Sequence, residues 1–247
     1  YFATSYGHEV VQAITATCES FLRSPPEGFS EVPLLHPRDC IWFGRPDQAA
    51  NLAAVQRDNP RLEFIDANEI RARVPVFAPD YLHGGLWDRR GGDLDVDALL
   101  QGYLRLFRRR GGRLLGNHEA IEIGRAGSGW EVRTADASFG APVVVNAAGA
   151  HAREIAQLAG LDVPVTPDSH EGGVTEPVAR FLEPMVVDTR PMPGSANFYF
   201  YQHHTGQVVF CITPDPPIVG TDRRETSTFA GTQEFIFKHA ILRDVTY

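Results

Sequence analysis

The sequence contains no apolar run of the roughly 18 residues that a membrane-spanning helix requires. It also has no excess of basic residues, because 31 acidic side chains against 23 basic ones give a formal net charge of −8. Nucleic acids and anionic membranes bind to basic surfaces, so we expect neither as a main partner. The basic run Arg108 to Arg110 is typical of a helix end, where cations offset the helix dipole.

Cysteine is scarce, with only Cys18, Cys40 and Cys211 at widely separated positions and no Cys-x-x-Cys spacing. An odd number of isolated cysteines argues against a disulfide framework and against a zinc site. We therefore expect a reducing compartment, the cytoplasm being the simplest, and no metal.

The three aspartates at 93, 95 and 97 have the spacing that opens a calcium-binding loop. The rest of that motif is absent, because Ala98 stands where the loop needs glycine and Leu104 where it needs glutamate. We instead expect an aspartate here to accept hydrogen bonds from the first free N–H groups of a helix.

Apolar residues at helical spacing predict helices over 9–22, 52–57 and 99–107, and the pattern Asp66-x-x-Glu69 predicts a capping box. Extended patterns predict strands at 40–43, 113–116, 120–123, 130–133 and 138–139, and a hairpin turn at 202–206. Mixed helices and strands of this kind predict an α/β fold.

The stretch Val143 to Val145 is followed by the small residues Ala147, Ala148 and Gly149 and by a short helical pattern. Three consecutive β-branched residues predict a strand that is buried on both faces. The small residues would let the backbone of the turn approach a ligand closely. The alternative is a tight turn with no ligand, since this pattern occurs in most α/β proteins.

Three segments together resemble the FAD-dependent D-amino-acid oxidase superfamily: Gly92 to Leu99, Asn146 to Ala152 and, most specifically, His170 to Pro177. The similarity is greatest to the branch of glycine oxidases, sarcosine oxidase β subunits and dye-linked proline dehydrogenases. The resemblance extends over roughly residues 1–230. One departure is Asp95-Val96, where the family commonly has Asp-Pro, so the helix start must depend on the aspartate cap.

The resemblance implies an α/β (α+β) architecture in which a partial, Rossmann-like FAD-binding domain accompanies a substrate domain with an antiparallel sheet. Residues 1–38 and 96–158 would form the FAD-binding part, and residues 39–95 and 159–230 the substrate-binding part. The family origin of residues 231–247 stays open.

The resemblance also implies an activity, in which FAD accepts a hydride from the α-carbon of a small amine or amino acid. It does not specify the substrate or the electron acceptor. Catalytic roles carry over to Tyr6, Tyr199 and His170, of which His170 could meet a substrate carboxylate as an imidazolium. The cofactor-contacting positions would be Glu119, Ala120, Asn146, Ala147, Ala148, Gly149 and Ala150.

Each catalytic assignment has a structural alternative. Tyr6 and Tyr199 could be core aromatics whose hydroxyls are hydrogen-bonded, and His170 could be a buried structural histidine. Placing His170 at a carboxylate would require a raised pKa, because an unperturbed histidine is mostly neutral at neutral pH.

The family's Gly-x-Gly-x-x-Gly turn, which seats the FAD pyrophosphate at a helix N-terminus, has no counterpart in this sequence. We therefore expect a fragment whose full-length version binds FAD, and we expect this chain alone not to retain the cofactor. The alternative is a non-catalytic remnant or binding domain without flavin.

Overall fold

The computed structural model describes residues 1–219 except 8, 79, 170, 190–197 and 213–217. The described residues form two compact units, which we treat separately. The first contains residues 1–107 and 171–212, and the second contains residues 108–169 and 218–219. Within the described residues, no helix is both long and apolar enough to cross a membrane.

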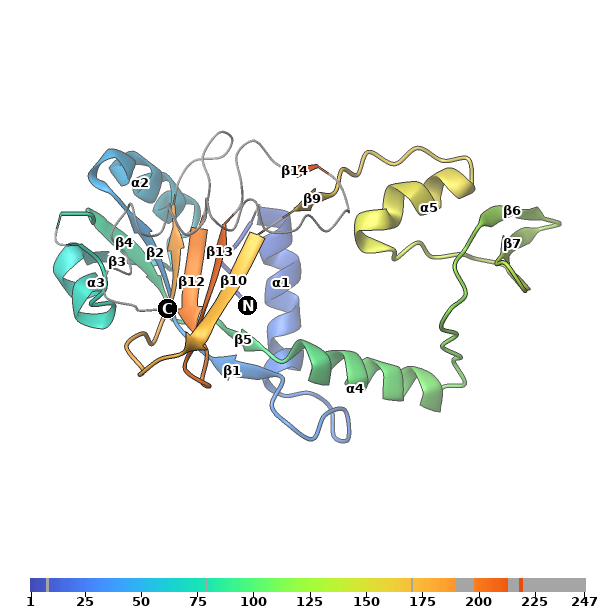
Figure 1. The fold of residues 1–247 in the computed structure, drawn as a ribbon, viewed down its shortest axis with the longest axis horizontal. Helices are drawn as coiled ribbons and strands as arrows, with labels where there is room; N and C mark the ends of the chain where they lie inside the picture. The colour runs from blue at the N-terminus through green and yellow to red at the C-terminus, as the bar shows by residue number, and fades with distance from the viewer. Residues whose placement is uncertain (8, 79, 170, 190–197, 213–217, 220–247) are drawn as a thin grey trace. The chain divides into compact units, whose positions relative to one another are not determined.

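The first unit combines helices with a large sheet and a two-stranded ribbon (Figure 1). Its helices are α1 (Glu9–Arg23), η1 (Pro46–Gln48), α2 (Ala49–Asp58), α3 (Ala67–Arg73) and α4 (Val96–Arg109), the end of which passes into the second unit. Its strands are β1 (Leu35–Pro37), β2 (Cys40–Gly44), β3 (Glu63–Asp66), β4 (Gly84–Asp88), β5 (Gly92–Leu94), β10 (Glu171–Pro177), β11 (Met185–Asp188), β12 (Phe198–Gln202) and β13 (Gln207–Ile212).

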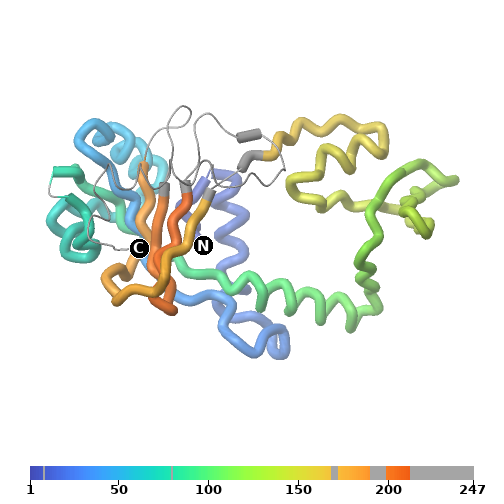
Figure 2. Tube along the Cα trace, viewed as in Figure 1, coloured from blue at the N-terminus to red at the C-terminus, as the bar shows by residue number. Residues whose placement is uncertain are grey.

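The large sheet has seven strands in the order β10-β13-β12-β11-β2-β4-β3. All neighbours are antiparallel except β2 and β11, which run parallel. The sheet therefore joins an early part of the chain, blue to green in Figure 2, to a late part shown in orange. The architecture confirms the predicted mixture of helices with a largely antiparallel sheet.

Side chains alternate between a buried and an open face along the central strands. Ile41 and Phe43 of β2 lie in the main core with Val186 of β11 and Phe200 of β12, each at most 2% exposed. The residues between them face the other side of the sheet and are only half-buried. We call these two sides the core face and the open face.

Two helices cover opposite sides of the sheet near β4. Ile70 of α3 belongs to the core cluster on the core face. Leu52 of α2 packs with Trp42 and Leu86 on the open face. Gly85 of β4 is required here, because a Cβ would lie 2.8 Å from the Trp42 carbonyl oxygen and 3.0 Å from the Ile70 side chain.

Helix starts that were predicted from aspartate residues are confirmed. The Asp66 carboxylate accepts from the N–H groups of Asn68 and Glu69, and the Glu69 side chain completes the capping box. The Asp95 carboxylate accepts from the Ala98 N–H at 2.8 Å. Capping therefore replaces the calcium motif as the role of the aspartate at 95.

Helix α1 forms as predicted, but burial is confined to its C-terminal end. Leu22 is 7% exposed and joins a second core cluster with Phe2 and Phe29. Val10 and Ile14 in the first turns are 57% and 61% exposed. The periodicity therefore predicts the helix correctly and overstates how much of it is covered.

Gln202, the last residue of β12, has a buried side chain that holds the adjoining loops. Its Oε1 accepts from the N–H groups of Phe181 and Leu182, and its Nε2 donates to the carbonyls of Val178, Ala179 and Gly206. The side chain is 1% exposed. These bonds fix the 202–206 turn, which was predicted as a hairpin, against the segment that precedes β11.

The second unit contains a small antiparallel meander. Its elements are β6 (Glu122–Ala126), β7 (Gly129–Arg133), β8 (Ser138–Ala141), η2 (Gly149–His151), α5 (Ala152–Leu158) and the short pair β9 (Asp168–Ser169) and β14 (Ile218–Val219). The β6-β7-β8 order confirms three of the strands that alternation predicted.

The prediction of a buried strand at Val143 to Val145 is wrong for this chain. These residues form no strand, and Val143 and Val145 are 70% and 81% exposed. The strand predicted at 113–116 is likewise absent, with Leu114 58% exposed. A β-strand is stabilised by pairing, and the described chain places no partner strand beside either segment.

The division by packing differs from the division expected from the family. Packing places residues 1–38 with the large sheet, whereas the resemblance assigns them to the FAD-binding part. Packing does not show which ligand each part binds. The assignment of residues to an FAD-binding part and a substrate-binding part therefore stays a prediction.

Gln202→Ala should lower the free energy of unfolding by about 3 kcal/mol, because it removes the partner of two backbone N–H groups and of the Val178 and Ala179 carbonyls. Urea denaturation followed by fluorescence measures the loss. Gln101→Ala, at an exposed position of α4, should change the value by less than about 0.5 kcal/mol. Equal effects of the two changes would contradict the role of Gln202.

Val145→Lys should slow aggregation of the chain, because a charge interrupts a run of three β-branched residues of which Val143 and Val145 are exposed. Light scattering at fixed concentration measures the rate. Leu161→Lys adds the same charge at a residue of the same unit that is 56% exposed and lies outside the run. A benefit of the same size from Leu161→Lys would show that net charge alone is responsible.

Candidate functional site

The open face of the large sheet carries a row of cross-strand neighbours. Trp42 of β2 pairs with Val187 of β11, Val187 with Tyr199 of β12, and Tyr199 with Cys211 of β13. Directly paired residues project to the same side of a sheet, so the row forms one continuous surface. We call it the Trp42–Tyr199 row.

Tyr199, one of the residues predicted from the sequence, lies in the middle of this row and is half-buried. Burial raises the pKa of its phenol well above the usual range, and a hydrogen bond with Cys211 raises it further. The charges that Cys211, Tyr201 and Tyr6 would carry when ionised act in the same direction. The hydroxyl of Tyr199 is therefore held in its neutral form.

Tyr6 lies on the segment before α1 and reaches the same face. Its ring stacks on the indole of Trp42 with a centroid separation of 6.2 Å and an interplanar angle of 20°. The side chain is 63% exposed, so Tyr6 is not a core aromatic. The structure thus brings Tyr6 and Tyr199 to one face of the sheet, with Trp42 stacked on Tyr6 and in line with Tyr199.

Trp42 was predicted only as part of a strand and was missed as a site residue. Its indole nitrogen is buried and has no hydrogen-bond partner among the described residues. A hollow of about 640 Å³ lies beside it, and Tyr6 also lines this hollow. Nothing in the sequence separates Trp42 from an ordinary strand aromatic, because its role depends on which face β2 presents.

Arg38 lies at one end of the open face, and its charge is already paired. It is therefore not a free cation for a ligand. Its guanidinium forms a 2.7 Å ion pair with Asp93, and the arginine side chain is 8% exposed. It also donates to the Glu183 carbonyl and lies 5.5 Å from the centre of the Tyr201 ring. A buried and fully engaged arginine of this kind orders its neighbours instead of binding an incoming carboxylate.

The predicted cofactor turn lies in the second unit. Asn146 holds it closed, because its Oδ1 accepts from the Ala148 N–H at 3.2 Å and its Nδ2 donates to the Ala152 carbonyl at 2.7 Å. Gly149 adopts a φ of +58°, the left-handed region that favours glycine. No heavy atom lies within 4 Å of a Cβ placed on Gly149, so the turn has an open approach.

Glu119 and Ala120 precede β6 in an extended segment, with Glu119 exposed and Ala120 half-buried. The backbone N–H of the next residue, Ile121, donates to the Arg133 carbonyl at 2.9 Å. This bond anchors the segment to the meander and leaves Glu119 accessible. His170, the third predicted catalytic residue, lies outside the described residues.

Residues 24–243 match the family model described as DAO, FAD dependent oxidoreductase. Sarcosine oxidase subunit β of Rhizobium meliloti is 31% identical over 159 residues, which are 64% of this chain and 34% of that protein. Dimethylglycine dehydrogenase of Rattus norvegicus is 29% identical over 146 residues, 58% of this chain and 17% of that protein. The chain thus spans about a third or less of the length of these two relatives.

Solved structures with the same fold include L-proline dehydrogenase from P. horikoshii, with a TM-score of 0.79 and 18% identity. That match covers 98% of this chain and 65% of the other. Glycine oxidase from Geobacillus kaustophilus has a TM-score of 0.74 and 17% identity, covering 96% of this chain and 64% of the other. At these identities the likeness concerns the fold.

The residues present fit FAD in part. The open turn at 146–150 exposes small residues and backbone, which suits close contact with a flat or polar group. The predicted contact residues supply no cationic side chain for a pyrophosphate, and the helix after the turn has only seven residues. The chemistry of the predicted contact residues therefore suits the flat part of the cofactor and not its phosphates.

Tyr199→Phe should make stability less sensitive to alkaline pH. Because the folded state raises the pKa of Tyr199, its stabilising contribution is complete below the unfolded tyrosine pKa of about 10 and is lost as the pH rises above it. Denaturation at a series of pH values should show a steeper decline for the parent chain than for the variant. Parallel curves would contradict the burial of this hydroxyl.

Proposed function

The chain belongs to the DAO family of FAD dependent oxidoreductases, and we propose that it contributes the substrate-facing sheet for oxidation of a small amine or amino acid. The observation that carries the proposal is the Trp42–Tyr199 row, a half-exposed aromatic surface on an otherwise well-packed sheet. Relatives named for sarcosine and dimethylglycine support an amine as the substrate.

FAD, when bound, would supply the acceptor for the hydride that leaves the α-carbon of the substrate. Loss of this hydride from a neutral amine would leave an iminium ion, which water would hydrolyse. The protein's part is to place the C–H bond correctly, to keep the amine neutral and to exclude bulk water until the transfer is complete. No strong base is needed for such a step.

Tyr199 is suited to orient the substrate. A phenol that burial keeps neutral can donate one hydrogen bond and accept another, so it can meet a carboxylate or an amine without adding charge. Tyr6 and Trp42 would close the apolar side of the same pocket.

His170 is proposed as a partner for the substrate carboxylate. Among the described residues of the open face, Arg38 is already engaged with Asp93, so another cation is needed. An imidazolium at position 170 would provide it, and binding of a carboxylate substrate would then weaken as the pH rises through the pKa of this histidine.

Cofactor contact is proposed for Glu119, Ala120 and the turn Asn146 to Ala150. The accessible Glu119 carboxylate suits a hydrogen bond with a ribose hydroxyl, and the open backbone at Gly149 suits close approach of the cofactor. The pyrophosphate seat would come from a Gly-x-Gly-x-x-Gly segment, which is absent from residues 1–247. The three free thiols suit a reducing compartment such as the cytoplasm, which we also propose.

A non-catalytic binding domain is the second candidate function. The exposed segment Val143 to Val145 favours it, because the described chain leaves a strand-like segment of the cofactor part without a neighbour. The two candidates differ in whether a flavin is bound.

An extended protein that supplies the glycine-rich segment should be yellow and should lose its flavin absorbance under anaerobic addition of sarcosine, dimethylglycine, glycine or proline. Absorbance spectroscopy measures both properties. The 247-residue chain mixed with FAD should retain none after gel filtration, because several charge-assisted phosphate contacts of about 1.5–3 kcal/mol each are missing. An extended protein that cannot be loaded with flavin would contradict the proposed oxidation.

Tyr199→Phe in the extended protein should lower the rate constant of flavin reduction about tenfold, equal to one lost orienting hydrogen bond of about 1.4 kcal/mol. Tyr103→Phe removes the same hydroxyl at a 51% exposed position of α4, outside the Trp42–Tyr199 row, and serves as the matched control. An unchanged rate in Tyr199→Phe would remove this residue from the proposed site.

A further inference from the structure

The hollow beside Tyr6 and Trp42 has a distinctive chemical lining. It lies among the segment before α1, the first turn of α1 and the end of α2, and its volume is about 640 Å³. All of its lining residues belong to the first unit. We call it the Tyr6–Trp42 hollow.

Its charge is negative. Glu9 and Asp58 both line it, both side chains are exposed, and neither forms an ion pair or hydrogen bond with another described residue. The described residues of its wall include no arginine, lysine or histidine. Gln12 and Asn59 add neutral amide groups between the two carboxylates.

Its apolar wall is aromatic. The rings of Tyr6 and Trp42 lie within 20° of parallel, and the Tyr6 ring is largely exposed. The faces of tyrosine and tryptophan rings attract cations, and they do so most strongly where water is partly excluded. Aromatic faces combined with uncompensated carboxylates are the chemistry that recognises alkylated ammonium groups.

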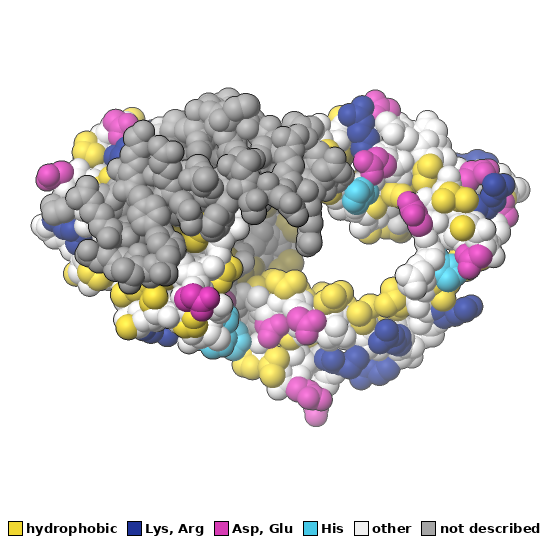
Figure 3. All heavy atoms as spheres, viewed as in Figure 1, with side chains coloured by type: hydrophobic (Ala, Val, Ile, Leu, Met, Phe, Trp, Pro, Cys, Tyr) yellow, Lys and Arg dark blue, Asp and Glu magenta, His cyan; other side chains and the backbone are white. Residues whose placement is uncertain are grey.

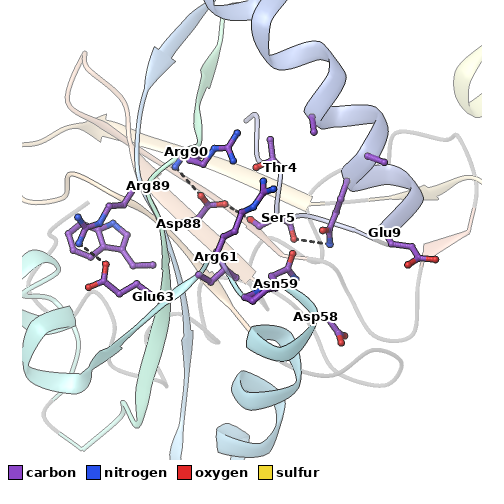
Figure 4. Close-up of a pocket in the computed structure, with 16 residues that line it drawn as sticks. Thr4, Ser5, Glu9, Asp58, Asn59, Arg61, Glu63, Asp88, Arg89 and Arg90 are labelled. Carbon is purple, nitrogen blue, oxygen red and sulfur yellow. Dashed lines mark hydrogen bonds and ion pairs between the residues drawn. The ribbon is translucent and has the colours of Figure 1, made fainter.

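An adjoining cavity of about 470 Å³ shares Glu9 and Asp58 with the hollow and contains the basic side chains of Arg61, Arg89 and Arg90 (Figure 4). There Arg89 pairs with Glu63 at 2.7 Å, and Arg90 pairs with Glu19. Asp88 is also engaged, because its carboxylate accepts from the Arg90 N–H and from Ser5. Glu9 and Asp58 line both cavities, and neither carboxylate forms an ion pair with Arg61 or with another described residue.

We propose that the Tyr6–Trp42 hollow binds the methylated ammonium group of a small cation. In the proposed function, this cation would be the protonated amine substrate before it reaches the open face. Only this identification of the cation rests on the proposed function. An N-methylated ammonium spreads its charge over methyl groups and has few N–H donors. It therefore suits the aromatic faces better than a primary ammonium does, and the two carboxylates attract its positive charge.

Isothermal titration of the 247-residue chain with choline tests the site without flavin or turnover. Choline should bind saturably, and its uncharged carbon isostere should bind at least about threefold more weakly, the effect of one exposed charge contact. Binding should also weaken with increasing salt, because both carboxylates are exposed.

Glu9→Gln and Asp58→Asn should each weaken choline binding about threefold, and the double change about tenfold. Tyr6→Leu should weaken it by about fivefold to tenfold through loss of the aromatic wall. Glu27→Gln removes one exposed carboxylate from the same unit, away from the hollow, and should leave the affinity unchanged.

Equal binding of choline and its isostere would overturn the proposal, and so would an equal effect of Glu27→Gln and Asp58→Asn. Either result would leave the proposed oxidation intact, because flavin reduction is measured separately. Conversely, specific choline binding by a protein that never takes up flavin would support this site and reject the oxidation.

Discussion

The parallel pairing of β2 with β11 is the contact on which the rest of the first unit depends. It joins residues about 145 positions apart, from Cys40–Met185 to Phe43–Asp188, and links two otherwise local sets of strands into one sheet. Additional bonds strengthen the junction: Thr189 donates to the Phe43 carbonyl, and Gln48 donates to the buried Asp188 carboxylate at 2.8 Å. Without this pairing each half would expose an unpaired strand edge and half of the apolar core.

The same pairing determines which side chains the sheet presents on its open face. Because register fixes which side chains share a face, the contact that buries Val186 also turns Trp42 and Val187 outward, in line with Tyr199. The buried face supplies rigidity, and the open face supplies half-exposed aromatic rings whose positions are held by the core behind them.

Charged side chains remain at the ends of the sheet, where Arg38 is neutralised by Asp93. Figure 3 shows basic side chains gathered instead at the C-terminal end of α4, as expected for a helix end.

Local chemistry could be predicted from the sequence, and long-range pairing could not. The capping aspartates, the helix at 9–23 and the meander are encoded within a few residues, so caps and periodicity identify them. The three valines at 143–145 carry the right propensity for a strand, yet a strand also needs a neighbour, which sequence pattern does not supply. Tyr6 and Tyr199 were predicted as site residues from the family resemblance, whereas Trp42 and the carboxylates around it became candidates only when register and packing were known.

The position of a bound inhibitor tests the account most directly. A crystal structure of the flavin-loaded, extended protein with a small carboxylate inhibitor measures the distance from the inhibitor to the Tyr199 hydroxyl oxygen. The account predicts that the inhibitor lies on the open face, within hydrogen-bond distance of that oxygen, with Trp42 and Tyr6 in the wall of its pocket. An inhibitor bound away from the open face, with Tyr199 still hydrogen-bonded only to Cys211, would contradict it.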